Sequence, residues 1–268
     1  MSNSILEEIN ARKRLEVAEA RKKVSLSGFR DFPLFSRPAC SLKSALRAPG
    51  SSGIIAEFKT KSPSKGLLHP DADVTTVTSG YVAAGAAGLS VLTDQAYFGG
   101  SLPHLEKARK ANPLTPLLRK DFIIDRWQIY ESKAFGADVI LLIAASLHQD
   151  GMAELARTAK ELGMEVLAEI HEEEELAKLN PDVDLVGVNN RNLKTFRVDV
   201  ETSVRLGRLL PATMVHVSES GLSSAAQIRA LREAGFEGFL MGETFMKTAD
   251  PAKSCKEFMK ELWVVDSR

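Results

Sequence analysis

Charged and amide side chains stand at the ends of several short apolar segments of this sequence. Glu57 and Lys59 close the first of these segments, two residues apart, and Lys120 closes the third, within LRKDF. Later segments are followed by Glu169, Asn189, Arg191 and Glu219. Lysines beside carboxylates are side chains suited to moving protons to and from a substrate. One such charge could belong to a structural ion pair, but burying the whole set is costly unless it acts on a ligand.

Two pairs of residues after the last two apolar segments suggest a second part of the same site. They are Ser220-Gly221 and Gly242-Glu243. Glycine lets the backbone approach an anion closely, and barrel enzymes often bind phosphate through the N–H groups of these loops. Either pair could also be an ordinary turn. The segment 62–66, SPSKG, adds further donors, including Ser62, so the combination favours a phosphorylated substrate over a neutral one.

The elements that must position these residues recur along the chain from residue 54. Eight short apolar or β-branched segments alternate with amphipathic stretches such as MAELARTAKELG; the segments are IIAEFK, LSVLTD, PLLRKDF, VILLIAA, EVLAEIH, LVGVNNR, MVHVSES and FLMGET. Near-continuous apolar runs of this length are typical of parallel strands that are buried on both faces. Several glycines precede these strands and are expected to be left-handed helix caps: Gly88, Gly136, Gly163 and Gly235.

Eight such units predict an α/β protein with a (β/α)8 TIM barrel, for which about 250 residues are typical. An open doubly wound sheet is the competing topology. It normally has a glycine-rich turn after its first strand, where this chain has KTKSPSKG instead. Because the carboxyl ends of all the strands of a barrel meet at one mouth, the candidate residues are expected to lie together there.

Residues 1–50 precede the repeat. We expect them to form an N-terminal helical extension of one barrel domain that comprises residues 1–268, since no linker separates the two parts. The segment 4–23 predicts a helix with a narrow apolar stripe made of Ile5, Ile9, Leu15 and Val17. This extension should cover the barrel mouth, and removing residues 1–45 should leave the eight units folded.

The composition argues against several other classes of protein. Among 268 residues, 35 Lys and Arg balance 35 Asp and Glu, so nucleic acid is not an expected partner. No apolar run is long enough to span a membrane, and the N-terminus lacks a signal-peptide pattern. Cys40 and Cys255 are too few for a disulfide framework, and the five histidines lack metal-ligand spacing. We expect a cytoplasmic protein without a metal; a monomer is only the default expectation.

Longer stretches of the chain resemble one family. The segments IIAEFKTKSPSKG, LSVLTDQAYFGGS, LLRKDFIIDRWQIYESKAFGADVILLIAA, VLAEIH, GVNNRNL, VSESG and MGETFMK are similar to the signatures of indole-3-glycerol phosphate synthase. The resemblance extends from about residue 45 to about residue 248, and the N-terminal helix matches the family's extension. It implies a carboxy-lyase of tryptophan biosynthesis that has no cofactor. Such an enzyme converts 1-(2-carboxyphenylamino)-1-deoxyribulose 5-phosphate to indole-3-glycerol phosphate, carbon dioxide and water.

The resemblance also implies roles for individual residues. Lys120 matches the general acid of ring closure, and Glu169 matches the carboxylate that removes a proton during dehydration. Glu57 and Lys59 match an acid–base pair. The remaining matches are substrate-orienting residues (Asn189, Arg191, Glu219), phosphate-binding residues (Ser62, Ser220, Gly221, Gly242, Glu243) and the apolar pocket for the aromatic ring (Leu92, Phe98, Phe122, Leu193, Met241). General acid catalysis by a lysine favours a pKa lowered toward 7, which neighbouring cations and a partly dry mouth would produce.

Two departures from the family pattern concern substrate affinity more than activity. Thr60-Lys61 stands where the family more often has Arg-Ala, and Asn192 stands where it often has Asp.

The sequence leaves two alternative functions to compare with this one. Phosphoribosylanthranilate isomerase, another phosphate-binding barrel, needs an Asp/Cys acid–base pair where this chain has Lys and Glu. A barrel that only binds a sugar phosphate would be free to lose the lysines, but all the matched positions are occupied.

Overall fold

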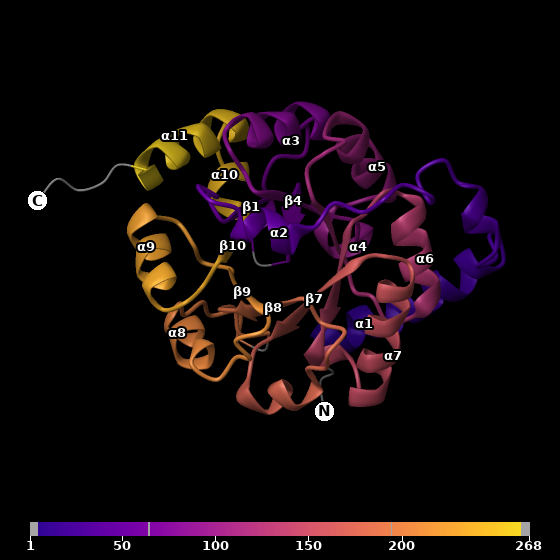
Figure 1. Ribbon diagram of the computed structural model, residues 1–268. Helices are drawn as coiled ribbons and strands as arrows, with labels where there is room; N and C mark the ends of the chain where they lie inside the picture. Colours follow the sequence, from indigo (N-terminus) through magenta and orange to yellow (C-terminus); the bar gives the residue numbers. More distant parts are fainter. Residues whose placement is uncertain (1–4, 64, 194, 264–268) are drawn as a thin grey trace, which may run out of the picture.

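The computed structural model describes residues 5–63, 65–193 and 195–263, so Ser4 of the segment 4–23 and Ser64 of SPSKG lie outside the described residues. Eight parallel strands close into a barrel in the order β1-β10-β9-β8-β7-β6-β5-β4. The helices form a ring around these strands, and their labels can be followed in Figure 1. The predicted (β/α)8 barrel is therefore confirmed.

The barrel strands coincide with the eight apolar segments of the sequence. They are β1 (Ile54–Phe58), β4 (Gly88–Leu92), β5 (Leu117–Lys120), β6 (Val139–Ile143), β7 (Glu165–Ile170), β8 (Leu185–Asn189), β9 (Val215–Glu219) and β10 (Gly238–Met241). A short antiparallel hairpin, β2 (Lys61–Ser62) with β3 (Gly66–Leu67), follows β1.

The α-helices are α1 (Ile5–Arg21), α2 (Leu42–Arg47), α3 (Val74–Ala83), α4 (Gln95–Phe98), α5 (Leu102–Ala111), α6 (Arg126–Ala134), α7 (Gln149–Glu161), α8 (Glu201–Gly207), α9 (Ala225–Glu233), α10 (Glu243–Met246) and α11 (Pro251–Trp263). Three short 3₁₀ helices are η1 (Gly28–Asp31), η2 (Ala144–Ser146) and η3 (Glu173–Lys178).

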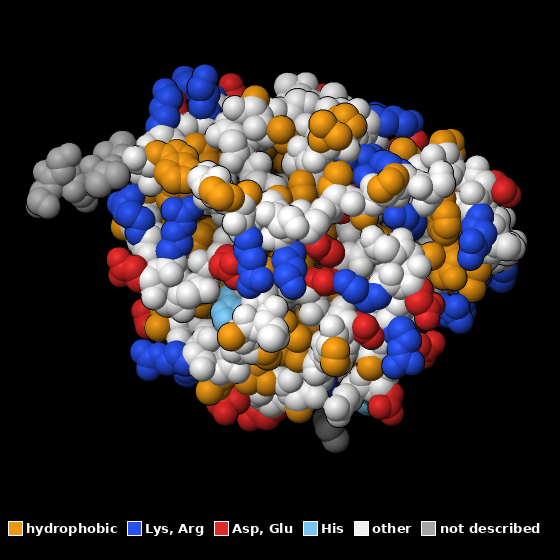
Figure 2. Space-filling model, in the orientation of Figure 1, with side chains coloured by type: hydrophobic (Ala, Val, Ile, Leu, Met, Phe, Trp, Pro, Cys, Tyr) orange, Lys and Arg blue, Asp and Glu red, His pale blue; other side chains and the backbone are white. Residues whose placement is uncertain are grey.

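Among the described residues, no helix is both long and apolar enough to cross a membrane. Positive and negative side chains are interspersed over the face in Figure 2.

The alternation of side chains along each strand separates the core into two layers. One set of buried residues, such as Ile54, Ala56 and Phe58 of β1, packs outward against the surrounding helices. The other set faces the barrel interior and includes Ile55 of β1 and Leu118 of β5. Continuing the inward set along the same two strands leads to Glu57 and Lys120. The interior therefore changes from apolar to charged toward the carboxyl ends of the strands.

The glycines expected as helix caps agree with the structure at three of four positions. Gly136, Gly163 and Gly235 have φ of 85°, 68° and 92°, in the left-handed region. The prediction is wrong for Gly88, which is the first residue of β4; the left-handed residue after α3 is Gly85, with φ of 99°. A Cβ at Gly88 would lie 2.5 Å from Leu42 Cδ1, so this glycine makes room for a helix of the extension.

The N-terminal extension covers both ends of the barrel. Ile5, Leu6 and Ile9 of α1 lie at the mouth, where they line a cavity, as the sequence predicted for the extension. Leu15 does not share this face, contrary to the predicted stripe, because 71% of its surface is exposed. The second helix, α2, lies instead at the amino ends of the strands, with Leu42 packed among the interior residues of the barrel and fully buried.

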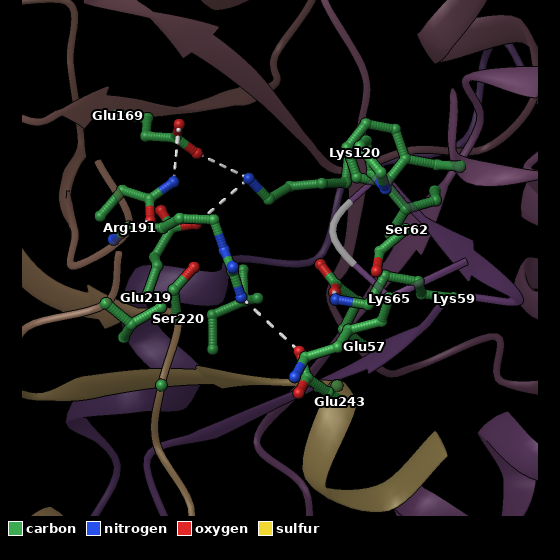
Figure 3. Close-up of a pocket in the computed structure, with 18 of the residues that line it drawn as sticks. Glu57, Lys59, Ser62, Lys65, Lys120, Glu169, Arg191, Glu219, Ser220 and Glu243 are labelled. Atoms are coloured by element: carbon green, nitrogen blue, oxygen red, sulfur yellow. Dashed lines mark hydrogen bonds and ion pairs between the residues drawn. The ribbon is translucent and has the colours of Figure 1, made fainter. Parts of the chain in front are cut away.

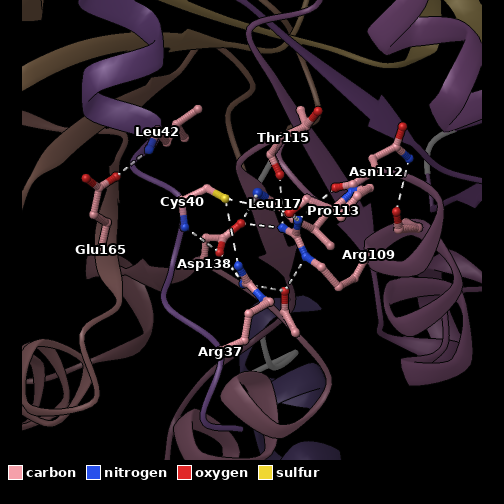
Figure 4. Close-up of polar contacts among 12 residues, drawn as sticks. Arg37, Cys40, Leu42, Arg109, Asn112, Pro113, Thr115, Leu117, Asp138 and Glu165 are labelled. Atoms are coloured by element: carbon pink, nitrogen blue, oxygen red, sulfur yellow. Dashed lines mark hydrogen bonds and ion pairs between the residues drawn. The ribbon is translucent and has the colours of Figure 1, made fainter. Parts of the chain in front are cut away.

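Two carboxylates at the amino ends of strands anchor the extension (Figure 4). Asp138, just before β6, forms ion pairs with Arg37 and Arg109 and accepts a hydrogen bond from the backbone N–H of Cys40 at 2.8 Å. Glu165 of β7 accepts hydrogen bonds from the N–H groups of Leu42 and Lys43 at 2.8 Å and 3.1 Å. These bonds satisfy the first N–H groups of α2 and fix its position below the barrel.

A buried lysine holds α1 at the opposite end. Lys13 is only 5% exposed, and its Nζ lies 3.0 Å from Asp94 Oδ2 and 3.1 Å from Asp121 Oδ1. Burial alone would raise the pKa of Asp121, but Arg119 and Lys13 outweigh it and hold that pKa at about 2. Since Asp121 directly follows Lys120, α1 is tied to the residue next to the principal candidate acid.

Candidate active site

A cavity of about 550 Å³ lies at the carboxyl ends of the barrel strands. Every site residue named from the sequence lines it: Glu57, Lys59, Ser62, Leu92, Phe98, Lys120, Phe122, Glu169, Asn189, Arg191, Leu193, Glu219, Ser220, Gly221, Met241, Gly242 and Glu243. These residues belong to seven of the eight strand–loop units, so the barrel topology alone brings them together.

Lys120 occupies the centre of a group of carboxylates. Its Nζ lies 2.6 Å from Glu169 Oε2 and 3.2 Å from Glu219 Oε2, and both carboxylates point toward it in Figure 3. Burial lowers the pKa of Lys120, but the charges of Glu169, Glu219 and Glu57 outweigh this and raise it above its usual range. The predicted lowering is therefore wrong: the neighbours of Lys120 are carboxylates, and they stabilise its ammonium form.

The two carboxylates that share Lys120 are held in different protonation states. Burial raises the pKa of Glu169, but Lys120 and His171 outweigh it and lower that pKa to about 2. Burial raises the pKa of Glu219 as well; Lys120 opposes this effect and the charge of Glu169 adds to it, so the pKa reaches about 7. One lysine cannot neutralise two buried carboxylates, so near neutral pH Glu169 is ionised while Glu219 exchanges a proton.

Gly187 leaves the space that the side chain of Glu219 occupies in the barrel. A Cβ at Gly187 would lie 2.1 Å from Glu219 Oε1, so any side chain there would displace this carboxylate. Oε1 of Glu219 has no hydrogen-bond partner among the described residues, although it is buried. A buried acceptor of this kind is costly unless it is protonated or binds a ligand. Both alternatives fit a carboxyl group that works on a substrate.

Glu57 and Lys59 form an ion pair at 2.7 Å, as their common face on one strand predicts. Ser90 Oγ of the neighbouring strand donates a hydrogen bond to Glu57 Oε2 at 3.4 Å. Gly242 lies against the same carboxylate, because a Cβ at this position would be 2.8 Å from Glu57 Oε1. Replacing Gly242 by a larger residue would thus displace Glu57 as well as any anion, and such a variant would not isolate a phosphate contact.

The loops after β9 and β10 form the other end of the cavity. Ser220 and Gly221 have φ of 69° and 77°, so two consecutive residues are left-handed and the backbone turns sharply there. Glu243 begins α10, and its Oε2 lies 3.6 Å from Arg191 Nη2 (Figure 3). Lys59, Lys65 and Lys247 also line the cavity. Cations and backbone turns at this end suit a phosphate group.

The remaining wall is apolar. The rings of Phe98 and Phe122 lie with centroids 6.0 Å apart, and Leu92, Leu193 and Met241 line the same cavity. The sequence did not single out Leu6 and Phe196, which also line the cavity. The i to i+4 spacing of Ile5 and Ile9 pointed to the helix that contains Leu6, but Phe196 has no such pattern. Its backbone is left-handed, with φ of 58°.

The two departures from the family pattern make local contacts. Lys61 Nζ donates to the backbone oxygen of Ala96 at 3.1 Å, and Thr60 Oγ1 donates to that of Gly99 at 3.2 Å. Asn192 Oδ1 accepts a hydrogen bond from the N–H of Thr195 at 2.9 Å. These residues therefore shape the loops around the mouth.

Within the described residues, no group of His, Cys, Asp and Glu could hold a metal ion.

The cavity as a whole combines an ammonium group and carboxylates of unequal acidity with apolar side chains and further cations. These side chains suit a substrate that carries both an aromatic group and an anion, with the reacting atoms beside Lys120. Such a site is suited to general acid–base chemistry on a phosphorylated aromatic compound.

Comparisons with known proteins agree with this geometry. The family model described as indole-3-glycerol phosphate synthase matches residues 6–258. The chain is 49% identical over 260 residues to a protein of that name from Bacteroides thetaiotaomicron, covering 96% of this chain and 98% of the relative. A protein of the same name from Acidovorax sp. is 44% identical, with 94% of this chain and 97% of the relative covered.

Solved barrels show the same fold at low sequence identity. The 3-hexulose-6-phosphate synthase of Salmonella typhimurium superposes with a TM-score of 0.62 at 14% identity, covering 78% of this chain and 97% of that chain. The tryptophan synthase alpha subunit of Legionella pneumophila has a TM-score of 0.60, also at 14% identity, and covers 82% of this chain and 95% of that chain. With a family model that spans nearly its whole length and relatives approaching half identity, the chain belongs to the indole-3-glycerol phosphate synthase family.

Proposed function

We propose that this chain converts 1-(2-carboxyphenylamino)-1-deoxyribulose 5-phosphate to indole-3-glycerol phosphate, with release of carbon dioxide and water. The observation that carries this proposal is Lys120, held between Glu169 and Glu219 in a cavity that both apolar side chains and cations line. The substrate has a matching distribution of groups: an aromatic ring at one end, a phosphate at the other and a ketone between them.

Lys120 is proposed as the general acid of ring closure. As the ring carbon attacks the ketone, negative charge develops on the carbonyl oxygen, which then competes with Glu169 and Glu219 for a proton of the ammonium group. Loss of carbon dioxide from the attacking ring carbon, which bears the carboxylate, restores the aromatic ring. The new hydroxyl then leaves as water with a proton from Lys59, and the ionised Glu169 removes a proton from the adjacent CH2 carbon, which completes the indole.

The other lining residues are proposed to bind and orient the substrate. The turn at Ser220 and Gly221, together with Gly242, Glu243 and Ser62, offers backbone and hydroxyl donors to the phosphate. The apolar wall around Phe98 and Phe122 accommodates the aromatic ring. Glu57 and Lys59, as an ion pair beside the reacting carbons, are proposed as a second acid–base pair.

The direct test is fluorescence detection of indole-3-glycerol phosphate formed from the carboxyphenylamino substrate by the purified protein. Product formation with equimolar release of carbon dioxide would support the proposal. Absence of both from a folded protein that binds the substrate would contradict it and favour a barrel that only binds sugar phosphates.

Substrate affinity should depend on the protonation state of the Glu219 carboxyl group. Because burial and the charge of Glu169 raise the pKa of Glu219 to about 7, this group is neutral below that pH and anionic above it. An added negative charge in the cavity disfavours an anionic substrate, so KM should rise about tenfold between pH 6 and pH 8. In Glu219→Gln the KM should change less over the same range, because the amide does not titrate.

The substrate phosphate also titrates in this pH range, but it does so for both proteins. Its effect on KM therefore cancels when the KM profile of the variant is compared with that of the unmodified protein. Parallel KM profiles for Glu219→Gln and the unmodified protein would mean that Glu219 does not titrate in this range.

A further inference from the structure

A histidine lies behind the principal carboxylate of the site. His171 follows β7 directly and is two residues from Glu169, so its side chain lies on the same side of the chain. Only 8% of this side chain is exposed, and it is absent from the residues that line the cavity. His171 therefore lies outside the cavity lining, and its contact with the site is through Glu169.

Both ring nitrogens of His171 face carboxylates. Nε2 lies 3.3 Å from Glu169 Oε1, and Nδ1 lies 3.7 Å from Glu175 Oε2 of η3. A neutral imidazole has one N–H and one lone pair, so it would direct its lone pair toward one of these anions. The imidazolium ion, with two N–H groups, matches both partners. The backbone N–H of His171 also donates to Glu175 Oε2 at 2.6 Å, which holds η3 against the ring.

The charged groups around His171 favour the same form. Glu169 precedes it on β7, Glu175 faces it from η3, and Glu219 of β9 adds a third negative charge at longer range. Burial lowers the pKa of His171, but the nearby carboxylates, Glu175 and Glu169 foremost, outweigh it and raise that pKa above the usual value. Lys120 binds the other carboxylate oxygen of Glu169, Oε2.

Glu169 thus has a separate partner for each oxygen. Oε2 accepts a hydrogen bond from Lys120 at 2.6 Å, while Oε1 accepts one from Asn189 Nδ2 at 3.1 Å and faces His171. When Lys120 gives its proton to the substrate, Glu169 loses this cation. Among the described residues, His171 is then the remaining cation within ion-pair distance of Glu169.

We propose that His171 is a positioning residue which, as an imidazolium ion, holds Glu169 in place and keeps it ionised after Lys120 has donated its proton. Glu175 keeps His171 charged from the opposite side. This inference rests on the proposed function, because it gives Glu169 a proton to remove. It predicts that His171 affects turnover and leaves substrate affinity unchanged, since the ring does not reach the cavity.

The first experiment measures the steady-state constants of His171→Gln from pH 6 to pH 9. Losing the ion pair between His171 and Glu169 should lower kcat about 10- to 100-fold at neutral pH, with KM unchanged. In the unmodified protein kcat should fall on the alkaline side as His171 loses its proton, and the variant should lack this fall. The matched control is His216→Gln: His216 is half-buried, hydrogen-bonds to the Pro211 oxygen near the amino ends of the strands, and should not affect kcat.

The second experiment is an NMR titration of protein with ¹⁵N-labelled histidine, using His171→Gln to assign the resonance. Both ring nitrogens of His171 should carry protons at pH 7. Glu175→Gln should move the titration and the alkaline fall of kcat to lower pH together, and it also serves as the test if His171→Gln fails to fold. A neutral His171 at pH 7, or an unchanged kcat profile in both variants, would overturn the inference. An unmodified protein that forms no product would instead contradict the proposed function.

Discussion

Replacing Lys120 by methionine should lower kcat about 10²–10⁴-fold, the usual contribution of general acid catalysis. Methionine keeps most of the length and apolar surface of the lysine stem but cannot donate a proton. The barrel should stay folded, because Glu169 and Glu219 can take up protons once the ammonium group between them is removed. The measurement is single-turnover formation of indole-3-glycerol phosphate, with circular dichroism to show that the fold is retained.

A matched control is Lys133→Met. Lys133 is also buried, but it lies outside the cavity and donates to the backbone oxygen of Arg37 at 2.9 Å. Its replacement should affect stability and leave kcat near that of the unmodified protein. A loss of less than tenfold in Lys120→Met, or an equal loss in both variants, would remove Lys120 from the role of general acid.

Deleting residues 1–45 should unfold the barrel or leave it too unstable to purify. This expectation reverses the one drawn from the sequence, because the deletion removes Leu42 from the barrel interior and Arg37 from Asp138. Losing a buried leucine costs about 2–5 kcal/mol, and leaving a buried charge without its partner costs about 3–5 kcal/mol. Together these losses approach the total stability of an ordinary domain, about 5–15 kcal/mol. Thermal and urea unfolding of the truncated protein give the measurement.

A shorter deletion, of residues 1–24, separates the two roles of the extension. It removes α1 but keeps α2 and the partners of Asp138 and Glu165. The barrel should then fold with reduced stability, because Asp94 and Asp121 lose Lys13 but Asp121 keeps Arg119. The loss of Ile5, Leu6 and Ile9 from the cavity wall lets water in and should raise KM and lower kcat. If the protein that lacks residues 1–45 has the same unfolding temperature and urea midpoint as the full chain, this part of the extension is dispensable for stability. Unchanged kinetic constants after the 1–24 deletion would show that α1 does not contribute to the site.

The side chains that share the cavity could be predicted from the sequence because strand geometry is local. Alternation places Glu57 with Lys59 on one face of β1, and the barrel topology brings the ends of all strands to one mouth. Strand positions follow from β-branched segments in the same way. Neither conclusion requires knowledge of a distance between residues that are far apart in the chain.

The contacts between distant segments could not be predicted in this way. Lys13 and Asp121 are brought together by the docking of α1, and Leu42 enters the barrel because Gly88 leaves space at the amino end of β4. The sequence predicts the helix that carries Lys13 and shows the glycine at position 88. It does not show that Lys13 contacts Asp121 or that Leu42 contacts Gly88, because these contacts are set by the packing of the whole barrel.

The electrostatics of the site likewise depend on the tertiary structure. That Lys120, Glu169 and Glu219 belong to one mouth follows from the sequence, since each lies at or near the carboxyl end of a barrel strand. The raised pKa of Lys120, the ionised state of Glu169 and the proton exchange of Glu219 near pH 7 depend on the folded barrel. A pKa is set by burial and by charges within a few ångströms, and these neighbours come from other strands across the barrel. His171, which no sequence pattern singled out, depends on the tertiary structure for the same reason.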